Sequence, residues 1–179
     1  MRQTDYLKEN KDALALLQRI ETFKAFSDKD IGTFLELGKF REYDAGETII
    51  KKGDVDFWVY FLVTGKVKIV KGEQTFAELS LPGSLFGEMG VIDGQPRSAS
   101  VWALTKTTVL GLDCSRLDDK RKEGQSIFLY TVFRLFAESL ADRLRITNEE
   151  VLRLQKIVKE KDAEIAKLKG EKPADTLWV

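Results

Sequence analysis

The chain has 179 residues, enough for one domain with an extension. Its 29 basic and 29 acidic residues cancel, and 43% of its residues are hydrophobic, as in an ordinary soluble globular protein. Nucleic-acid-binding proteins usually carry a basic excess, because phosphate contacts supply their non-specific affinity, so the balance argues weakly against DNA as a partner.

Histidine is absent and cysteine occurs once, at Cys114. This composition excludes histidine-based nucleophilic triads, the common zinc sites and iron–sulfur ligation. We therefore expect no catalytic residue and no metal site, and we interpret Cys114 as a small buried residue. Asp54 and Asp56 suggest calcium, but their short turn lacks the remaining ligands.

The chain begins with a charged segment, and no apolar run approaches the roughly 20 residues of a transmembrane helix. These features predict a cytoplasmic protein that does not contact a membrane. Residues 1–38 are predicted to be an N-terminal helical segment, because Leu14, Leu17 and Ile20 have helical spacing within residues 11–38. Ser27 has the character of a helix start and predicts a second short helix after it.

Residues 39–124 have the pattern of a β domain. Short β-rich runs, many of them separated by glycine, predict an antiparallel barrel or sandwich with turns of positive φ. The predicted strands cover residues 47–50, 57–63, 66–70, 75–81, 101–104 and 107–112, and the predicted turn glycines are Gly53, Gly65, Gly72 and Gly83.

A short charged helix is predicted at residues 115–122, followed by a break at Gly124. The next predicted segment, residues 125–170, is a dimerisation segment formed by a long helix from about residue 126 to about residue 169. The second part of the long helix follows a heptad repeat. Its a positions are Leu144, Val151, Val158 and Ile165, and its d positions are Leu140, Thr147, Leu154, Lys161 and Leu168.

β-branched residues at a with leucine at d favour a parallel two-stranded coiled coil, so we predict a homodimer through residues 140–168. Glu164 at g and Lys169 at e are placed to pair between chains. The alternative is one amphipathic helix docked on its own barrel. The narrow seam and the length of the helix favour the dimer.

Residues 171–179 form a predicted flexible tail that ends in the apolar residues Leu177, Trp178 and Val179. These three residues are suited to docking on a groove or on the sheet edge of a partner protein. The alternative is an ordinary frayed or packed terminus.

Residues 83–101 are glycine-rich yet flanked by predicted strands. A helical turn between Gly87 and Gly90 would present backbone N–H groups to an anion. Arg97, after a proline, offers a guanidinium fork for two phosphate oxygens, and Ser98 adds a hydroxyl donor. Glu88 would repel a phosphate but would accept a hydrogen bond from a sugar hydroxyl, so the segment predicts a ribose phosphate ligand. The alternative is an ordinary glycine turn with a surface arginine.

The sequence Phe86-Gly87-Glu88-Met89-Gly90, followed by Pro96-Arg97-Ser98-Ala99, resembles the phosphate-binding cassette of the cyclic-nucleotide-binding domain family. The resemblance implies a mainly β fold with flanking helices, an eight-stranded jelly-roll barrel. It implies that Glu88 binds the ribose 2′-hydroxyl and that Arg97 and Ser98, next to Ala99, bind the cyclic phosphate. Gly87, Met89 and Gly90 would supply backbone and wall contacts.

Residues 140–149 resemble the dimerisation helix of the catabolite-activator members of that family, where a Thr-Ser pair contacts the base. Thr147 matches the threonine, and Asn148 replaces the serine with a side chain that both donates and accepts. The alternative for Thr147 is a polar seam residue that sets register. Ser98 favours cyclic AMP over cyclic GMP by the same resemblance.

We therefore expect a homodimeric cyclic-nucleotide sensor that passes its signal to a protein partner through the coiled coil or the tail. Too few residues follow the long helix for a DNA-binding domain, so we expect neither DNA binding nor catalysis. The alternative is a structural or adaptor coiled-coil protein whose barrel is vestigial and binds no nucleotide.

Overall fold

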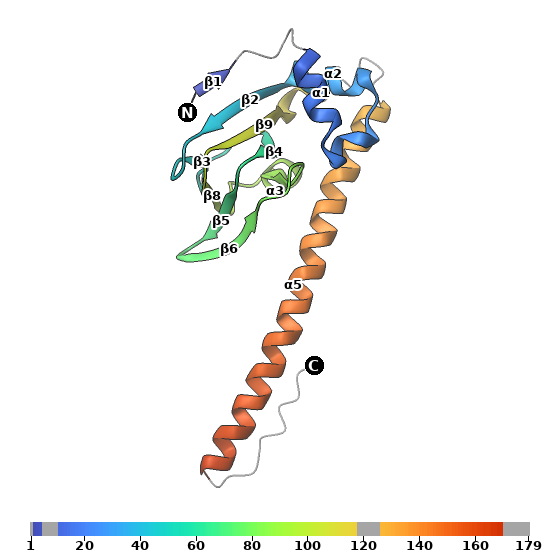
Figure 1. Ribbon diagram of the computed structural model, residues 1–179. Helices are drawn as coiled ribbons and strands as arrows, with labels where there is room; N and C mark the ends of the chain where they lie inside the picture. The colour runs from blue at the N-terminus through green and yellow to red at the C-terminus, as the bar shows by residue number, and fades with distance from the viewer. Residues whose placement is uncertain (1, 5–10, 118–125, 170–179) are drawn as a thin grey trace. The chain divides into compact units, whose positions relative to one another are not determined.

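The computed structural model describes residues 2–4, 11–117 and 126–169. The chain divides into two compact units, Met1–Phe136 and Ala137–Val179. The first unit contains all the strands and the short helices, and the second contains most of the long helix α5 (Figure 1).

The strands of the first unit form two antiparallel sheets, with the orders β1-β2-β9-β4-β7 and β3-β8-β5-β6. Strands β2 to β9 make the predicted eight-stranded jelly roll, which confirms the fold class. The strands are β1 (Arg2–Thr4), β2 (Gly38–Tyr43), β3 (Thr48–Ile50), β4 (Trp58–Thr64), β5 (Val67–Lys71), β6 (Gln74–Leu79), β7 (Leu85–Phe86), β8 (Ser100–Ala103) and β9 (Thr107–Asp113).

The six predicted strands correspond to β3, β4, β5, β6, β8 and β9, and the positive φ of the four predicted turn glycines is confirmed. Three strands were not predicted. Strand β2 mixes charged and apolar residues, β7 has only two residues, and β1 adds a ninth strand beside β2. Their pairing partners are distant in sequence, so local periodicity does not reveal them.

Within the predicted N-terminal helical segment 1–38, the helices expected in residues 11–38 are α1 (Lys11–Gln18), the 3₁₀ helix η1 (Glu21–Ala25) and α2 (Asp28–Leu37), whereas Arg2–Thr4 is strand β1. The start signal at Ser27 is a full capping box. The Ser27 hydroxyl accepts from the Asp30 N–H at 3.3 Å, and the Asp30 carboxylate accepts from the Ser27 N–H at 3.0 Å. Two backbone donors at the helix start are thereby satisfied.

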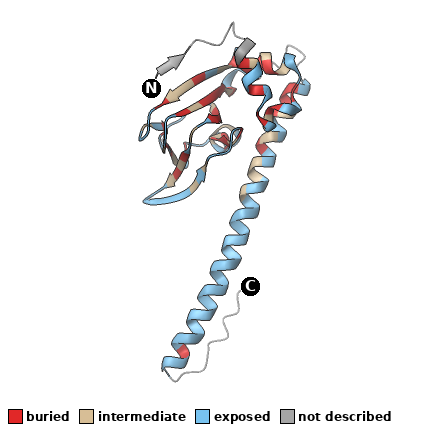
Figure 2. Cartoon of the chain, in the orientation of Figure 1, coloured by how far each residue is buried: buried red, intermediate tan, exposed pale blue. Residues whose placement is uncertain are grey.

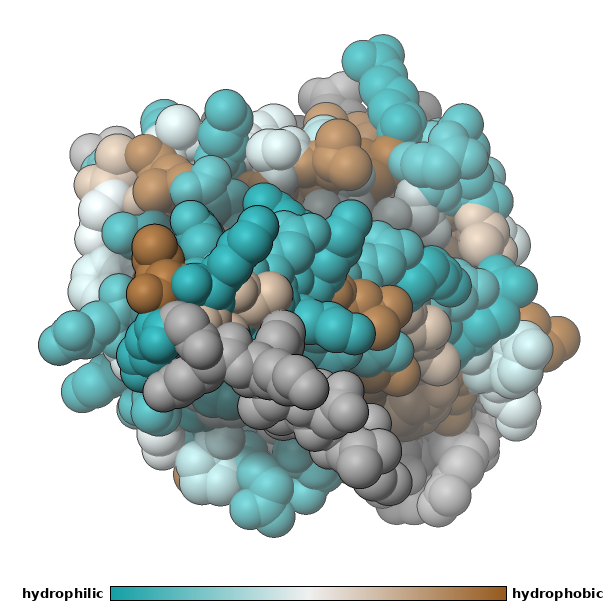
Figure 3. Space-filling view, turned by 90° about the horizontal axis from the view of Figure 1, so that it is seen from below, coloured by the Kyte–Doolittle hydropathy of each residue, from teal (hydrophilic) through white to brown (hydrophobic). Residues whose placement is uncertain are grey.

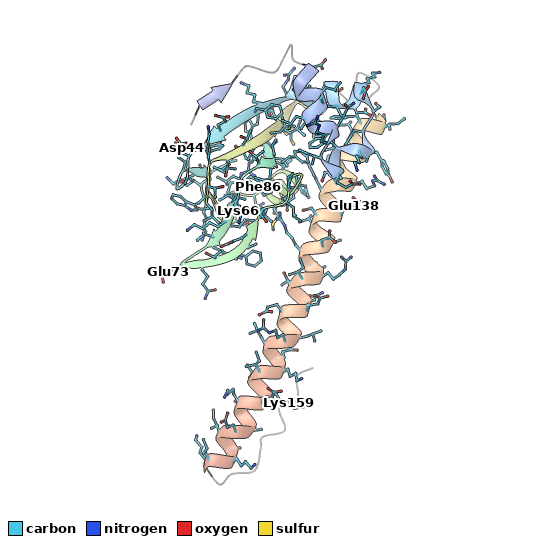
Figure 4. The ribbon with its side chains drawn as sticks, viewed as in Figure 1. Asp44, Lys66, Glu73, Phe86, Glu138 and Lys159 are labelled. Atoms are coloured by element: carbon cyan, nitrogen blue, oxygen red, sulfur yellow. The ribbon has the colours of Figure 1, made fainter. Side chains whose placement is uncertain are left out.

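Two apolar clusters stabilise the first unit (Figure 2). One lies between the helices and the β1-β2-β9-β4-β7 sheet, where Phe34 packs edge-on against Phe61 and Phe128, with ring centroids 5.7 and 5.1 Å away. Phe128 comes from the first turns of α5, which belong to this unit. The other cluster lies between the two sheets and includes Phe86, labelled inside the barrel in Figure 4.

The end of the barrel leads into the 3₁₀ helix η2 (Cys114–Arg116). The predicted helix at 115–122 thus begins as a short 3₁₀ turn, and positions 118–122 lie outside the described residues, as does the tail 171–179. Cys114 is buried as predicted, and burial raises the pKa of its thiol to about 12. The long helix is confirmed as α5 (Ser126–Lys169).

On the face shown in Figure 3, hydrophobic residues form separate patches among hydrophilic ones. Across the described ranges, no helix combines the length and the apolar character needed to cross a bilayer.

Replacing Phe34 with alanine removes a fully buried ring that also contacts Phe23 and Phe26. We expect Phe34→Ala to lower the free energy of unfolding by about 3–5 kcal/mol, because a large cavity forms among aromatic neighbours. Urea denaturation followed by tryptophan fluorescence measures the change. Phe76→Ala, at an exposed position, is the control, and an equal loss for both variants would contradict the assigned core.

Candidate functional site

The segment 87–94 folds as a short helix, α3 (Glu88–Asp93), with a glycine at each end. Gly87 before it and Gly94 after it both adopt left-handed backbone, with φ of +85° and +66°. Glycine adopts this conformation without strain. One residue at each end is therefore enough for the chain to change direction into and out of α3. The helix thereby fits between β7 and the loop that carries Arg97.

Arg97 is the buried centre of this region, with 4% of its surface exposed. Its Nε donates to Asp56 Oδ2 at 3.2 Å, and its Nη2 donates to Asp56 Oδ1 and to the Trp58 carbonyl oxygen. Its Nη1 donates to the Gly87 carbonyl oxygen. The guanidinium therefore binds protein oxygens, and its contact with a phosphate stays a prediction. The alternative of a surface arginine is wrong.

Asp56 was not identified as part of this site from the sequence, where it stood only as a weak calcium candidate. Its Oδ1 accepts from Arg97 and also from the Trp58 N–H at 2.8 Å. A buried guanidinium requires a counter-charge, and that requirement is the one signal that points to an acidic partner. The sequence contains 29 acidic residues and no local pattern that selects Asp56 among them.

The backbone of Arg97 is also fixed. Its N–H donates to the Asp54 carbonyl oxygen and its carbonyl oxygen accepts from the Gly53 N–H, both at 2.9 Å. The Ser100 hydroxyl accepts from the Lys52 N–H at 2.9 Å. These bonds hold the turn after β3 and the loop before β8 together. The Arg97 side chain is therefore fixed both at its backbone and at its guanidinium.

Gly87 and Gly90 face the Arg97 side chain. A Cβ atom added at Gly87 would lie 2.9 Å from Ile50 Cδ1 and 3.0 Å from Arg97 Nη1. A Cβ atom at Gly90 would lie 3.1 Å from the Gln95 carbonyl oxygen and 3.6 Å from Arg97 Cδ. The sequence predicted these glycines for their backbone N–H groups, and the structure adds close packing as a second requirement.

The remaining predicted residues of the segment lie at different depths. Glu88 is fully buried, Met89 is 46% exposed, Ser98 is exposed and Ala99 is half-buried against the barrel cluster. Residues 87–90 and 97–99 thus come together in one region. Thr147 and Asn148 are exposed on α5 in the second unit, and their contribution stays a prediction.

An aromatic cluster supports the start of β4. The Arg41 guanidinium lies 4.2 Å from the centroid of the Trp58 ring, and its Nη1 donates to the Tyr60 hydroxyl at 3.1 Å. Tyr60 in turn stacks on Phe86, with ring centroids 5.5 Å apart. Gly111 makes room, since a Cβ atom there would lie 3.2 Å from both the Trp58 and Tyr60 rings. The sequence analysis did not identify Arg41 or this cluster.

The donor count of Arg97 decides what the site can do chemically. A guanidinium has five N–H groups, and four of them donate to the oxygens of Asp56, Trp58 and Gly87. The fifth, on Nη1, has no acceptor among the described residues. A bidentate contact with an anion therefore requires Arg97 to release one of its protein acceptors. No group of three or more acidic or cysteine side chains in the described ranges is arranged to hold a metal ion.

The family described as "Cyclic nucleotide-binding domain" matches residues 40–123. The chain is 28% identical over 137 residues to the cGMP-dependent protein kinase of Plasmodium berghei, covering 76% of this chain and 15% of the kinase. It is 32% identical over 94 residues to the cyclic AMP receptor protein of Thermus thermophilus, covering 50% of this chain and 44% of that protein. The matched segment spans less than half the length of both relatives.

Among solved structures, a cyclic nucleotide-binding domain from Methylobacillus flagellatus has a TM-score of 0.68 and 24% identity. The match covers 80% of this chain and 82% of the other. At this identity the likeness concerns the fold, and it agrees with the jelly roll described above.

Replacing Asp56 with asparagine keeps the shape but removes the counter-charge of a buried guanidinium. We expect Asp56→Asn to lower the free energy of unfolding by about 2 kcal/mol, less than for a fully buried pair because the Asp56 side chain is 35% exposed. Urea denaturation of Asp56→Asn and of its neighbour control Asp54→Asn measures the effect. A loss no larger for Asp56→Asn than for Asp54→Asn would contradict the ion pair.

Burial raises the pKa of Tyr60 to about 12, well above the value near 10 of an unfolded tyrosine. Between about pH 10 and 12 the unfolded chain loses this proton and the folded chain keeps it, so stability falls as pH rises. Unfolding measured across this range should show a shallower loss for Tyr60→Phe than for the parent protein. The exposed Tyr130→Phe is the control, and identical slopes for all three would contradict the burial effect.

Proposed function

Because residues 40–123 belong to the cyclic nucleotide-binding domain family, a regulatory sensor fold, we propose that this chain is a homodimeric sensor that prefers cyclic AMP to cyclic GMP. The relatives above are named for one or the other of these nucleotides. A cyclic nucleotide presents one phosphate with two exocyclic oxygens and one free ribose hydroxyl, the 2′-hydroxyl. The proposal assigns these groups to the region around α3.

The observation that carries the proposal is the buried Arg97 guanidinium. A buried charge is costly unless it is paired, and Arg97 is paired with Asp56 at Nε and Nη2 while Nη1 keeps one N–H without an acceptor among the described residues. That nitrogen lies beside Gly87, where a side chain would block it. The phosphate approaches here, takes the available N–H, and replaces the Gly87 carbonyl oxygen as the second acceptor on Nη1.

The neighbouring residues complete the recognition of phosphate and ribose. Ser98 is exposed and donates its hydroxyl to a phosphate oxygen, while Glu88 accepts the hydrogen bond of the ribose 2′-hydroxyl. The full burial of Glu88 keeps water away from that contact, and a hydrogen bond is electrostatically stronger at such a site than in water. Gly87 and Gly90 supply backbone contacts, and Met89 and Ala99 supply apolar ones.

The choice of base is assigned to Thr147 and Asn148 on α5. An asparagine side chain both donates and accepts, and a threonine hydroxyl does the same, so the pair is able to read the edge of a purine. The preference for cyclic AMP rests on Ser98 through the family resemblance. In the dimer both chains would supply this pair, so base recognition and dimerisation share one helix.

The output is assigned to a protein partner that binds the coiled coil of residues 140–168 or the tail, with neither DNA nor a membrane involved. Hydrolysis of a phosphodiester normally recruits metal ions held by histidine and clustered carboxylates, and this chain contains no histidine. The sensor therefore acts by coupled binding. Such coupling is typically about 1–3 kcal/mol, and it is reciprocal, so the partner strengthens nucleotide binding as much as the nucleotide strengthens partner binding.

Isothermal titration calorimetry with cyclic AMP and cyclic GMP tests the site. We expect the wild type to bind cyclic AMP more tightly and Arg97→Lys to bind at least tenfold more weakly, because a lysine keeps the charge but loses the fork. Arg97→Ala should abolish measurable binding. The exposed Arg19→Ala is the matched control and should bind as the wild type does.

Equal binding by the wild type and both Arg97 variants would remove Arg97 from the site. A folded wild type that binds neither nucleotide would favour the alternative of a coiled-coil adaptor with a vestigial barrel. Circular dichroism separates this outcome from loss of folding, because the strand signal persists in a folded variant.

A further inference from the structure

The second unit exposes an apolar seam along α5. Figure 2 shows most of this helix as exposed. Its described residues form one helix, so the seam has no second element of the same unit to pack on. From residue 144 onward, the large aliphatic side chains at positions a and d are 46–84% exposed: Leu144, Val151, Leu154, Val158, Ile165 and Leu168. Ile146 and Leu152 are also exposed but lie off the seam. Helices of this kind gain stability from packing an apolar face.

Two d positions interrupt the seam with polar residues, and each is followed at once by a polar e residue. The pairs are Thr147 with Asn148 and Lys161 with Asp162, two heptads apart. Lys161 donates to Glu164 in the same helix at 2.8 Å, whereas the Asp162 carboxylate makes no hydrogen bond or ion pair with any described residue. The second pair follows Lys159, which is labelled on α5 in Figure 4.

Glu164 at g and Lys169 at e are predicted to pair between the two chains of the coiled coil. Lys161 and Asp162 offer a second pairing, nearer to its core. In a parallel two-stranded coiled coil, each d side chain inserts into a hole of four residues on the facing helix, and that hole includes the e residue that follows the partner's own d residue. In register, Lys161 therefore faces the partner's Asp162. A shift of one heptad would place Lys161 beside the partner's Gln155 or the partner's Lys169 instead.

We propose that the occupant of this seam is a second copy of the chain, in parallel and in register, and that Lys161 of each chain forms an ion pair with the partner's Asp162. This inference rests on the homodimer of the proposed function and names the contact that sets its register. A charged residue at a core position specifies register at a cost in stability, and here the opposite charge next to it reduces that cost.

The register has a consequence for the ligand. Thr147 and Asn148 occupy the same d and e positions two heptads earlier, so an in-register pair at residues 161 and 162 holds both copies of Thr147 and Asn148 at one level. Each nucleotide then meets the threonine of one chain and the asparagine of the other. A shifted pair would separate them by about 10 Å, the rise of seven helical residues.

Sedimentation equilibrium of the full chain tests the contact by a charge-exchange cycle. Lys161→Glu and Asp162→Lys each put like charges side by side, so each should raise the dimer dissociation constant about tenfold. The double variant restores opposite charges and should return the constant to within about threefold of the wild type. Lys156→Glu, at the outward f position, is the matched control and should leave it unchanged.

Orientation is tested separately by oxidising a Leu168→Cys variant in a Cys114→Ser background. Facing d positions of a parallel, in-register pair cross-link, so we expect a covalent dimer. Additive effects of the two charge variants would overturn the Lys161–Asp162 contact while leaving the dimer. A dimer without the cross-link would overturn the parallel register. A monomeric wild type would overturn both the proposal and the homodimer, although nucleotide binding by the barrel would still stand.

Discussion

The buried ion pair between Arg97 and Asp56 is the interaction on which the geometry of the candidate site depends. It joins the loop before β8 to the turn after β3, and the same guanidinium also fixes the carbonyl groups of Trp58 and Gly87. Truncating Asp56 would leave the charge of Arg97, whose side chain is 3% exposed, without its partner in a region with little access to water. The conformation of three chain segments, one around Arg97, one around Asp56 and Trp58, and one at Gly87, therefore depends on one side chain, which is also the proposed phosphate ligand.

This double use explains why the glycines are where they are. Arg97 lies against the start of α3, where a Cβ atom at Gly87 would crowd its Nη1 and a Cβ atom at Gly90 would crowd the Gln95 carbonyl oxygen. The αL backbone of Gly87 has the further effect of starting a helix directly after a strand. On the other side, the stack of Tyr60 on Phe86 and of Arg41 on Trp58 holds β4 and β7 in place. This arrangement is thus formed without a ligand, and the proposed function requires Arg97 to exchange only one of its acceptors.

The sequence predicts local features of this fold well and long-range partners poorly. Ser27 and Asp30 are three residues apart, so the capping box that starts α2 is visible in the sequence, and the turn glycines are visible for the same reason. Glu88 and Arg97 were found because they belong to one short segment with a family pattern. Asp56 lies 41 residues before Arg97, and Arg41 meets Tyr60 only through the sheet. Such pairs are specified by strand register, which short-range periodicity does not contain.

The two units differ in how much of their apolar and charged side-chain surface they bury or pair internally. This difference matters for the proposed signalling. The first unit buries its apolar surface in two clusters and pairs its buried arginine internally. The second leaves a row of large aliphatic side chains in water, interrupted only by polar residues at two d positions. A surface of this kind responds to the concentration and identity of its partner by mass action. Because Thr147 and Asn148 lie on that same surface, a nucleotide that contacts them necessarily competes or cooperates with whatever covers the seam. In the proposed sensor, ligand choice and assembly are therefore linked through one helix face, and a change in the free energy of one must appear in the free energy of the other.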